Sequence, residues 1–200
     1  MILGVFGGIG SGKSEVLRIM KEGFQACVLQ ADQIAKSLYE EECGYEAVVR
    51  ICGREILDDQ EKIDRHKMAD LLFHDEAVRR NVNAAIHPMV YFRFSELTET
   101  CLKDHPETIV IYEAAILPEN REKLRLDYAV YVYSEKTVRI RRLTETRGMT
   151  ESRIESVMQR QPSEEEYRAF CDFEIENNGD IEELKEKTYE IIKYCQRKQR

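Results

Sequence analysis

The glycine-rich segment at residues 7–14 constrains the fold of this chain more than any other feature. It reads Gly-Gly-Ile-Gly-Ser-Gly-Lys-Ser and fits the pattern G-x-x-x-x-G-K-[ST]. The apolar run Ile2 to Phe6 precedes it directly, and Val16, Leu17 and Met20 follow it at helical spacing. A strand, a glycine loop and a helix in this order are typical of the start of a strand–helix–strand unit, so we expect the first strand to join a parallel sheet.

Further β-rich runs alternate with helical patterns along the rest of the chain. Strands that are linked through helices pair in parallel, and the near-continuous apolar character of these runs indicates a sheet covered on both faces. We therefore predict an α/β fold with a parallel sheet of about five strands flanked by helices. The expected strands are Ile2 to Phe6, Cys27 to Gln30, Thr108 to Tyr112, Tyr128 to Tyr133 and Phe173 to Ile175.

Three other segments are predicted to be helical. Residues 31–107, with helical spacing at positions such as Val78 and Val82, are too long for a single crossover and indicate an inserted helical lobe. Residues 135–170 carry many arginines among helix formers, and their simplest interpretation is a solvated helical face. A last helix is expected from Asp180, where Asp-x-x-Glu resembles a capping box. Its expected packing face is Ile181, Leu184, Ile191, Ile192 and Cys195.

The composition excludes some classes of partner for this chain. Its 200 residues include 30 Lys+Arg and 38 Asp+Glu, and the net charge of −8 repels both nucleic acid and an anionic membrane surface. The apolar stretches are far shorter than the roughly 20 residues of a membrane-spanning helix, and the amino terminus lacks the pattern of a signal peptide. We therefore predict a cytoplasmic protein that binds neither nucleic acid nor membrane. The six cysteines form no C-x-x-C pair, so we expect reduced packing residues.

The glycine loop has the chemistry of an anion cradle, or P-loop. Without Cβ atoms the loop can wrap around a phosphate with its N–H groups pointing inward, and the following helix N-terminus adds positive partial charge. Lys13 would reach the β- and γ-phosphates of ATP, and the Ser14 hydroxyl would ligate Mg²⁺. We therefore expect a sheet of the P-loop NTPase type. The expected ATP-binding residues of the loop are Gly8, Gly10, Ser11, Gly12, Lys13, Ser14 and Glu15.

The rest of the chain indicates which class of nucleotide-binding protein fits this sequence. The sequence Asn-Asn-Gly-Asp at 177–180 lacks the lysine of a guanine-reading Asn-Lys-x-Asp motif and is typical of a strand-to-helix turn, so we discount GTP. Motor and transporter ATPases are usually longer. The small size, the helical insertion and the arginine-rich segment favour a small-molecule kinase. A module that holds ATP without transferring it is the alternative from another class.

Asp32 is the first candidate catalytic carboxylate, because it follows the second expected strand at the edge where open α/β sheets bind ligands. A carboxylate there can accept the proton of an attacking hydroxyl and help to orient Mg²⁺. Asp is also a favoured helix N-cap, and a helix is expected to follow. Position alone leaves both interpretations open.

Five segments together resemble the dephospho-coenzyme A kinase family in order and spacing. The glycine loop occurs in many families, but an Asp-x-Ile-Ala sequence 18 residues after Ser14, followed by His-Pro after a long helical insert, is much more selective. The resemblance covers essentially the whole chain. The segments are Gly7 to Ser14, Asp32-Gln33-Ile34-Ala35, His87-Pro88, Glu113-Ala114-Ala115-Ile116-Leu117 and Ile175-Glu176-Asn177-Asn178-Gly179.

The resemblance implies transfer of the γ-phosphate of ATP to the ribose 3′-hydroxyl of dephospho-coenzyme A, the last step of coenzyme A synthesis, with Mg²⁺ as the metal. It also implies how a single domain at 1–200 is organised. The expected parts are a core at 1–30, 108–134 and 171–200, a helical acceptor lobe at about 31–107 and an arginine-bearing lid at about 135–170.

The resemblance further implies roles for individual residues. Asp32 matches the proposed base and, with Ser14, the expected metal position. Arg142 matches a lid arginine that would neutralise charge on the transferring phosphoryl group, and adenine is expected near Asn177. The expected acceptor-site residues are His87, Glu113 and Tyr39, with Tyr112 as a further candidate.

Several of these residues have structural alternatives. A His before Pro often ends a helix, and Glu113 could cap the segment after its strand. Arg147 and Arg160 depart from the family's register and could be surface residues paired with nearby glutamates. The closest rival function is a related P-loop kinase for a nucleoside or nucleotide. No sequence feature indicates the oligomeric state or a protein partner.

Overall fold

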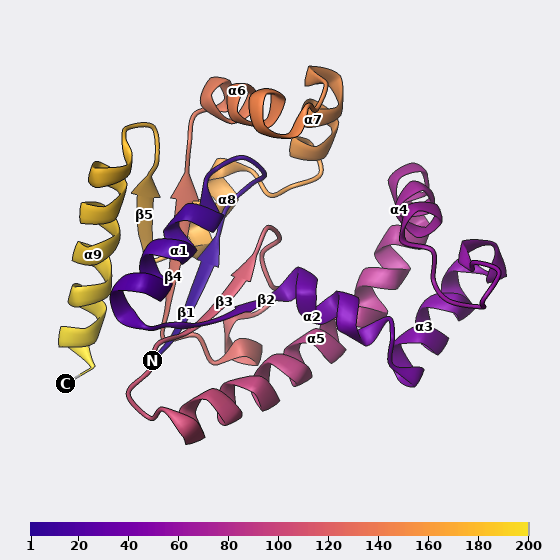
Figure 1. The fold of residues 1–200 in the computed structure, drawn as a ribbon, viewed down its shortest axis with the longest axis horizontal. Coiled ribbons are helices and arrows are strands. Elements are labelled where there is room, and N and C mark those ends of the chain that lie inside the picture. Colours follow the sequence, from indigo (N-terminus) through magenta and orange to yellow (C-terminus); the bar gives the residue numbers. More distant parts are fainter. Residues whose placement is uncertain (200) are drawn as a thin grey trace. The chain divides into compact units, whose positions relative to one another are not determined.

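A five-stranded parallel sheet lies at the centre of the first of two structural units in the computed structural model, which describes residues 1–199. This unit comprises residues 1–30 and the chain from Thr100 onward, and the second comprises Ala31–Glu99. The strand order is β2-β3-β1-β4-β5 (Figure 1). The predicted fold class is confirmed. The strands are β1 (Ile2–Phe6), β2 (Cys27–Gln30), β3 (Val110–Ala114), β4 (Tyr128–Tyr133) and β5 (Phe173–Glu176).

Strand β3 differs from the prediction by two residues, because it begins at Val110 rather than Thr108. The backbone N–H of Thr108 donates to the His105 carbonyl at 3.0 Å, which closes a turn, and the Thr108 hydroxyl donates to the Gln25 carbonyl at 3.1 Å. Both bonds keep Thr108 outside the sheet ladder. At its other end strand β3 extends past Tyr112, because Glu113 and Ala114 pair with Val5 and Phe6 of β1.

The sheet topology places a ligand crevice at the carboxyl ends of β1 and β3. The chain leaves β1 toward β2 on one side of the sheet and leaves β3 toward β4 on the other. Open α/β sheets bind ligands where successive connections diverge in this way. The glycine loop follows β1 at this point, and the parallel register pairs Val5 with Glu113.

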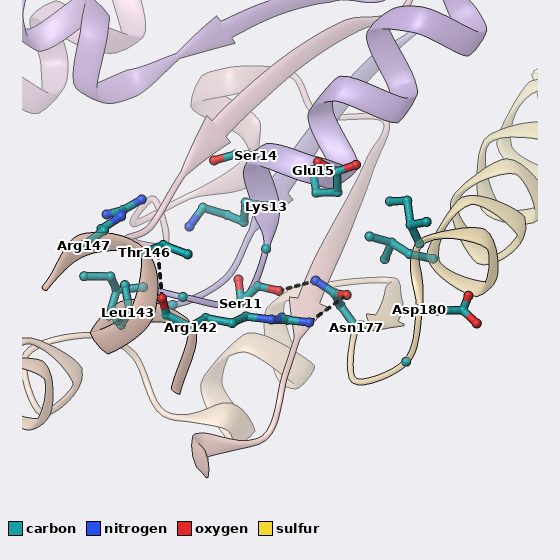
Figure 2. A pocket seen from close by; sticks show the side chains of 17 residues that line it. Ser11, Lys13, Ser14, Glu15, Arg142, Leu143, Thr146, Arg147, Asn177 and Asp180 are labelled. Atoms are coloured by element: carbon teal, nitrogen blue, oxygen red, sulfur yellow. Dashed lines mark hydrogen bonds between the residues drawn. The ribbon is translucent and has the colours of Figure 1, made fainter. Parts of the chain in front are cut away.

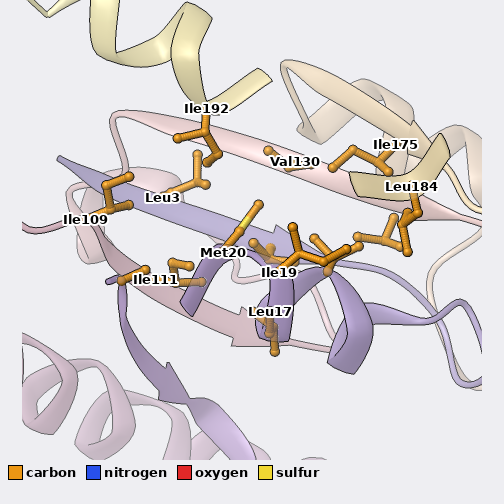
Figure 3. Packing of buried hydrophobic residues seen from close by; sticks show 14 residues of the cluster. Leu3, Leu17, Ile19, Met20, Ile109, Ile111, Val130, Ile175, Leu184 and Ile192 are labelled. Carbon is orange, nitrogen blue, oxygen red and sulfur yellow. The ribbon is translucent and has the colours of Figure 1, made fainter. Parts of the chain in front are cut away.

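One face of the sheet packs against helices α1 (Lys13–Phe24) and α9 (Ile181–Lys198), which lie side by side (Figures 1 and 3). The strand residues on this face alternate along each strand, as the period of two in a β-strand requires. Burial of these side chains is the main stabilising contribution of this layer. The buried cluster includes Leu3, Val5, Met20, Ile109, Ile111, Val130, Val132, Ile175, Leu184 and Ile192.

Helix α9 begins as predicted, and its packing face differs from the prediction at Ile181, whereas Ile191 is partly buried against the core as expected. The Asp180 side chain accepts a hydrogen bond from the Glu183 N–H at 2.9 Å and caps the helix. Leu184, Ile192 and Cys195 are buried, as expected. The prediction for Ile181 is wrong: its side chain is 42% exposed, because the first turn of α9 borders a cavity instead of the sheet.

The opposite sheet face carries aromatic side chains and helix α8 (Glu164–Phe170). The rings of Tyr131 and Tyr167 stack with centroids 4.7 Å apart, and Phe6 meets Phe170 edge-on at 5.3 Å. Helices α6 (Lys136–Arg147) and α7 (Glu151–Met158) precede α8 in the chain.

Asp172 joins the start of β5 to β4. Its carboxylate accepts a hydrogen bond from the Ala129 N–H at 2.7 Å and pairs with Arg121 at 2.6 Å, in a short 3-10 helix at Arg121–Leu124. Burial opposes ionisation of Asp172, but the hydrogen bonds from Arg121 and Ala129 outweigh it and lower the pKa of this carboxyl group.

Asp172→Asn is expected to lower the free energy of unfolding by about 1–2 kcal/mol at pH 7, because it removes a charged hydrogen-bond acceptor. A carboxylate with a lowered pKa in the folded state stabilises the protein above its unfolded pKa of about 3.9, and this contribution is lost as pH falls through the folded value. Urea unfolding at pH 7 and near pH 3 measures the difference. A gap between the two proteins that stays constant over this range would contradict the ionised role.

The second unit is helical. A Pro at position 88 lies inside its longest helix, and the helix continues through it, so the structural alternative in which His87-Pro88 ends a helix is wrong. Buried side chains on both sides of this point, such as Val82 and Phe94, stabilise the continuous helix. The elements are α2 (Ala31–Leu38), α3 (Glu42–Cys52), a 3-10 turn (Arg54–Ile56), α4 (Arg65–His74) and α5 (Glu76–Asp104), whose last turns enter the first unit. Each helix within residues 1–199 is too short or too polar to span a bilayer.

The cysteines differ from the expectation of reduced packing residues. Cys27, at the start of β2, and Cys101, in the last turns of α5, form a disulfide with their Cα atoms 6.7 Å apart. Their separation of 74 residues hides this proximity in the sequence. Among the other cysteines, Cys52 and Cys195 are buried and free, as expected.

Candidate functional site

The glycine loop between β1 and α1 forms one wall of a cavity of about 510 Å³ (Figure 2). Gly10 and Gly12 have φ angles of 78° and 91°, in the left-handed region that a residue with a Cβ rarely adopts. Within residues 1–199, the backbone N–H groups of Gly10, Gly12 and Ser14 donate to no other group. Helix α1 also begins without a side-chain cap. The loop thus offers donors and a helix N-terminus to an anion.

The carbonyl groups of the loop are held by other parts of the first unit. Asn177, which directly follows β5 and is 6% exposed, donates through Nδ2 to the Ser11 carbonyl at 2.9 Å. The Ser134 hydroxyl lies 3.1 Å from the same carbonyl. A Cβ on Gly12 would overlap Asn177 Nδ2, so Gly12 is required both by its φ angle and by this close approach. Asn177, predicted as a neighbour of adenine, therefore also supports the loop.

Lys13 lies where the loop meets β3. Its Nζ donates to the Gly7 carbonyl at 2.7 Å and lies 3.6 Å from Glu113 Oε1. The other oxygen of Glu113 accepts a hydrogen bond from Gln30 Nε2 at 3.1 Å. The side chains of Lys13 and Glu113 are each 12% exposed. The register of β1, β2 and β3 therefore brings a carboxylate to the loop lysine, and Gln30 is a partner of this carboxylate that the sequence analysis missed.

Arg142 provides a second cation at the cavity. It extends from α6, donates to the Ser134 hydroxyl at 3.0 Å and to Asn177 Oδ1 at 3.3 Å, and points across the loop (Figure 2). Burial and the neighbouring Arg141 lower the pKa of Arg142. Within the described chain no carboxylate pairs with Arg142, so this half-buried guanidinium is suited to an anionic ligand.

The other arginines of the segment have different surroundings. Arg147 lines the cavity and is exposed, whereas Arg160 is exposed and is absent from the lining found in residues 1–199. Arg139 does not form the solvated face that the sequence analysis considered, because its Nε donates to the Ile9 carbonyl at 2.8 Å.

The first unit thus brings most of the predicted site residues together around one cavity. Glu113 is connected to these residues by its ion pair with Lys13. Tyr112 is only 4% exposed in the sheet. The lining includes Gly8, Gly10, Ser11, Gly12, Lys13, Ser14, Glu15, Arg142 and Asn177.

Asp32, Tyr39 and His87 belong to the second unit. Helix α2 begins at Ala31, so Asp32 lies exposed in its first turn and the interpretation of Asp32 as N-cap is wrong. Burial and the charge of Asp32 raise the pKa of Tyr39, which indicates that the phenol lies near this carboxylate. His87 is half-buried on α5, with its ring 6.2 Å from that of Tyr91.

The second unit contains a cavity of about 550 Å³ that the sequence analysis did not predict. Tyr39 lines it together with Tyr45, Lys62 and Arg65. Arg65 pairs with Glu40 at 2.8 Å, and Asp58 is a further acidic residue of the wall. The residues of this wall come from the turn between α2 and α3, from α3, from the connection before α4 and from the start of α4, so no single stretch of sequence signals the cavity.

A phosphate cradle after the central strand of a parallel sheet, with a lysine and an arginine facing it, defines the P-loop nucleotide-binding class. The sequence model of the dephospho-CoA kinase family matches residues 1–183. The chain belongs to the dephospho-CoA kinase family, as the resemblance predicted.

Individual relatives agree with this assignment. The chain is 35% identical to a dephospho-CoA kinase of Aquifex aeolicus over 198 residues, covering 96% of this chain and 93% of the relative. It is 33% identical to a dephospho-CoA kinase of Thermobifida fusca over 199 residues, covering 98% and 96%. A crystal structure of a Thermus thermophilus protein superposes with a TM-score of 0.78 at 26% identity, covering 97% of each chain.

Proposed function

We propose that this protein is an ATP-dependent kinase that transfers the γ-phosphate of ATP to the ribose 3′-hydroxyl of dephospho-coenzyme A and releases coenzyme A and ADP. The chain belongs to the dephospho-CoA kinase family. The observation that carries the proposal is that its glycine loop presents N–H groups, which bond to no other group within residues 1–199, beside Lys13 and Arg142. Phosphoryl transfer depends mainly on positioning and electrostatic stabilisation, and this cavity supplies both.

The loop amides and Lys13 bind the phosphates in this proposal. Lys13 exchanges its bond with the Gly7 carbonyl for phosphate oxygens, while Glu113 keeps the ammonium group close to the loop. Arg142 compensates the charge that develops on the transferred group. Adenine occupies the end of the cavity near Asn177, Gly179 and Ile181. The exposed apolar side chain of Ile181 suits a flat base.

Asn177→Ala is expected to weaken ATP binding about tenfold, because the loop carbonyl of Ser11 loses its amide donor and Arg142 loses an acceptor. Titration calorimetry with ATP measures the affinity, and thermal unfolding of the same samples separates it from a loss of fold. An affinity within twofold of the wild-type value would contradict the supporting role of Asn177.

Ser14 and Asp32 are proposed as the protein ligands of Mg²⁺. Both carry oxygen donors, which Mg²⁺ prefers, and both side chains are exposed at the start of a helix. Within residues 1–199, no three acidic, histidine or cysteine side chains form a metal-binding group. This fits an ion that keeps several waters and takes its other ligands from phosphates. When bound, Mg²⁺ would neutralise phosphate charge.

Asp32 is also proposed as the group that receives the proton of the ribose hydroxyl. We infer that the lobe at about 31–107 binds the acceptor, with His87 and Tyr39 as contacts and Glu113 on the core side, and that the segment at about 135–170 acts as the lid. The cavity beside Tyr39 supports this inference because its wall is polar, and its two tyrosines, two cations and two carboxylates can form hydrogen bonds with a nucleotide-like acceptor. Cytoplasmic location stays a prediction.

An acceptor panel with ATP tests the function. Dephospho-coenzyme A is expected to be the preferred acceptor, with mass spectrometry locating the new phosphate on the 3′-oxygen. Preference for a nucleoside monophosphate would favour the related kinase instead. ATP binding without ADP release in the presence of any acceptor would favour a non-catalytic module.

A further inference from the structure

Ile9, in the outer turn of the glycine loop, is held at both of its backbone polar atoms by side chains from residues 135–170. Its N–H donates to Gln161 Oε1 at 2.8 Å, and its carbonyl accepts a hydrogen bond from Arg139 Nε at 2.8 Å. Arg139 lies on α6, and Gln161 follows α7. Both side chains are half-buried.

These two bonds fix the direction of the neighbouring peptide groups. In a planar trans peptide the N–H and the C=O point in opposite directions. Arg139 holds the carbonyl of the peptide that joins Ile9 to Gly10, so the Gly10 N–H must point to the other side. Gln161 likewise fixes the peptide before Ile9, whose Gly8 carbonyl accepts from the Ser11 N–H at 3.2 Å.

Gly8 has no side chain, and this leaves space beside the loop for Arg139 and Gln161. A Cβ on Gly8 would meet Arg139 Nη2 and would lie 2.9 Å from Gln161 Oε1. In the part of the chain that the structure describes, neither Arg139 nor Gln161 lines the cavity, whereas Arg142 of the same segment does. The two side chains therefore contact the loop without bordering the ligand space themselves.

We propose that Arg139 and Gln161 are positioning residues, which orient the Gly10 N–H toward the phosphates and couple the 135–170 segment to the loop. Donors that are oriented before the ligand arrives bind it without reorganisation. Gly10 is free to adopt either sign of φ, so its peptide group needs such an external restraint. This inference rests on the proposed function only in that the loop binds ATP.

Calorimetry of ADP and of a non-hydrolysable ATP analogue, each with Mg²⁺, tests the proposal on the full chain. Arg139→Met and Gln161→Leu are each expected to weaken both ligands about tenfold, since a loop donor loses its orientation. The double variant is expected to bind no more than about twofold more weakly than the weaker single variant, because both side chains restrain one turn. The control Arg141→Met, exposed on the same helix, is expected to stay within twofold of wild type.

Amide hydrogen exchange gives a readout that a general loss of stability would not produce. In Gln161→Leu the Ile9 amide is expected to exchange at least tenfold faster, whereas the amide of the core residue Ile175 keeps its rate. Wild-type nucleotide affinity in both variants, or unchanged Ile9 exchange in Gln161→Leu, would overturn the proposal. Gln161→Leu carries the test alone if Arg139→Met does not fold.

The two proposals fail in different ways. A wild-type protein that binds ADP but transfers no phosphate to dephospho-coenzyme A would refute the proposed function, and the affinities of the variants would still decide the role of Arg139 and Gln161. Variants with wild-type affinity in an active kinase would refute only the positioning role.

Discussion

Asp32→Asn is expected to lower the turnover of dephospho-coenzyme A phosphorylation at least a hundredfold, while ATP affinity stays within about threefold of wild type. General-base catalysis contributes about 10²–10⁴ to a rate, and Asn has nearly the shape of Asp but cannot take up a proton. Asp32 is exposed in the first turn of α2, so the fold itself loses at most a favourable interaction with the helix dipole of about 0.3–1 kcal/mol when this charge is removed. Steady-state kinetics and ATP titration measure the two quantities.

Asp59→Asn is a matched control for this variant. Asp59 is exposed in the same unit, and its substitution removes the same single negative charge. We expect it to retain wild-type turnover. Normal turnover in Asp32→Asn would remove the assignment of Asp32 as base. A parallel loss in both variants would indicate a general effect of charge on the lobe.

Local patterns were sufficient to predict the loop and most of the sheet. The glycines, Lys13 and Ser14 act within one short segment, and each strand has an apolar pattern of its own. The two-residue error in β3 arose because the bonds of Thr108 to His105 and Gln25 exclude it from the ladder. Such bonds depend on tertiary structure and are invisible in the local pattern.

Proline at position 88 shows a different limit. Proline inside a helix removes a hydrogen bond and costs about 3 kcal/mol, and for this reason a helix end was considered as the structural alternative at His87-Pro88. The buried positions of α5 on both sides of Pro88, including Ile86 and Val90, compensate this cost through packing. The sequence alone predicts the energetic cost of Pro88 in a helix, but it does not reveal the tertiary packing of α5 that offsets this cost.

The contacts that complete the site join residues far apart in the chain. Glu113 meets Lys13 only because β3 lies beside β1 in parallel register, and Gln30 reaches Glu113 because β2 lies beside β3. Gln161 and Ile9 are 152 residues apart. The resemblance indicated which residue types belong to the site, while their pairings required the three-dimensional arrangement.

Lys13→Met is expected to reduce kcat/KM for ATP by about 10²–10³, because it removes the one cation that the loop itself supplies. Met keeps most of the stem of Lys13 and so preserves its packing, whereas the bonds to the Gly7 carbonyl and Glu113 are lost. Lys21→Met, exposed on the same helix, is the matched control and is expected to stay within twofold of wild type.

Within residues 1–199, loss of this ammonium group also leaves the Glu113 carboxylate with one hydrogen-bond donor, Gln30 Nε2 at 3.1 Å, although the Glu113 side chain is only 12% exposed. An unpaired carboxylate of this kind destabilises the fold, so the single variant should melt at a lower temperature than wild type. Adding Glu113→Gln to Lys13→Met is expected to restore the melting temperature but not kcat/KM. Recovery of activity in the double variant would mean that Lys13 serves mainly to neutralise Glu113, and kcat/KM within tenfold of wild type in Lys13→Met alone would refute its role as a phosphate ligand.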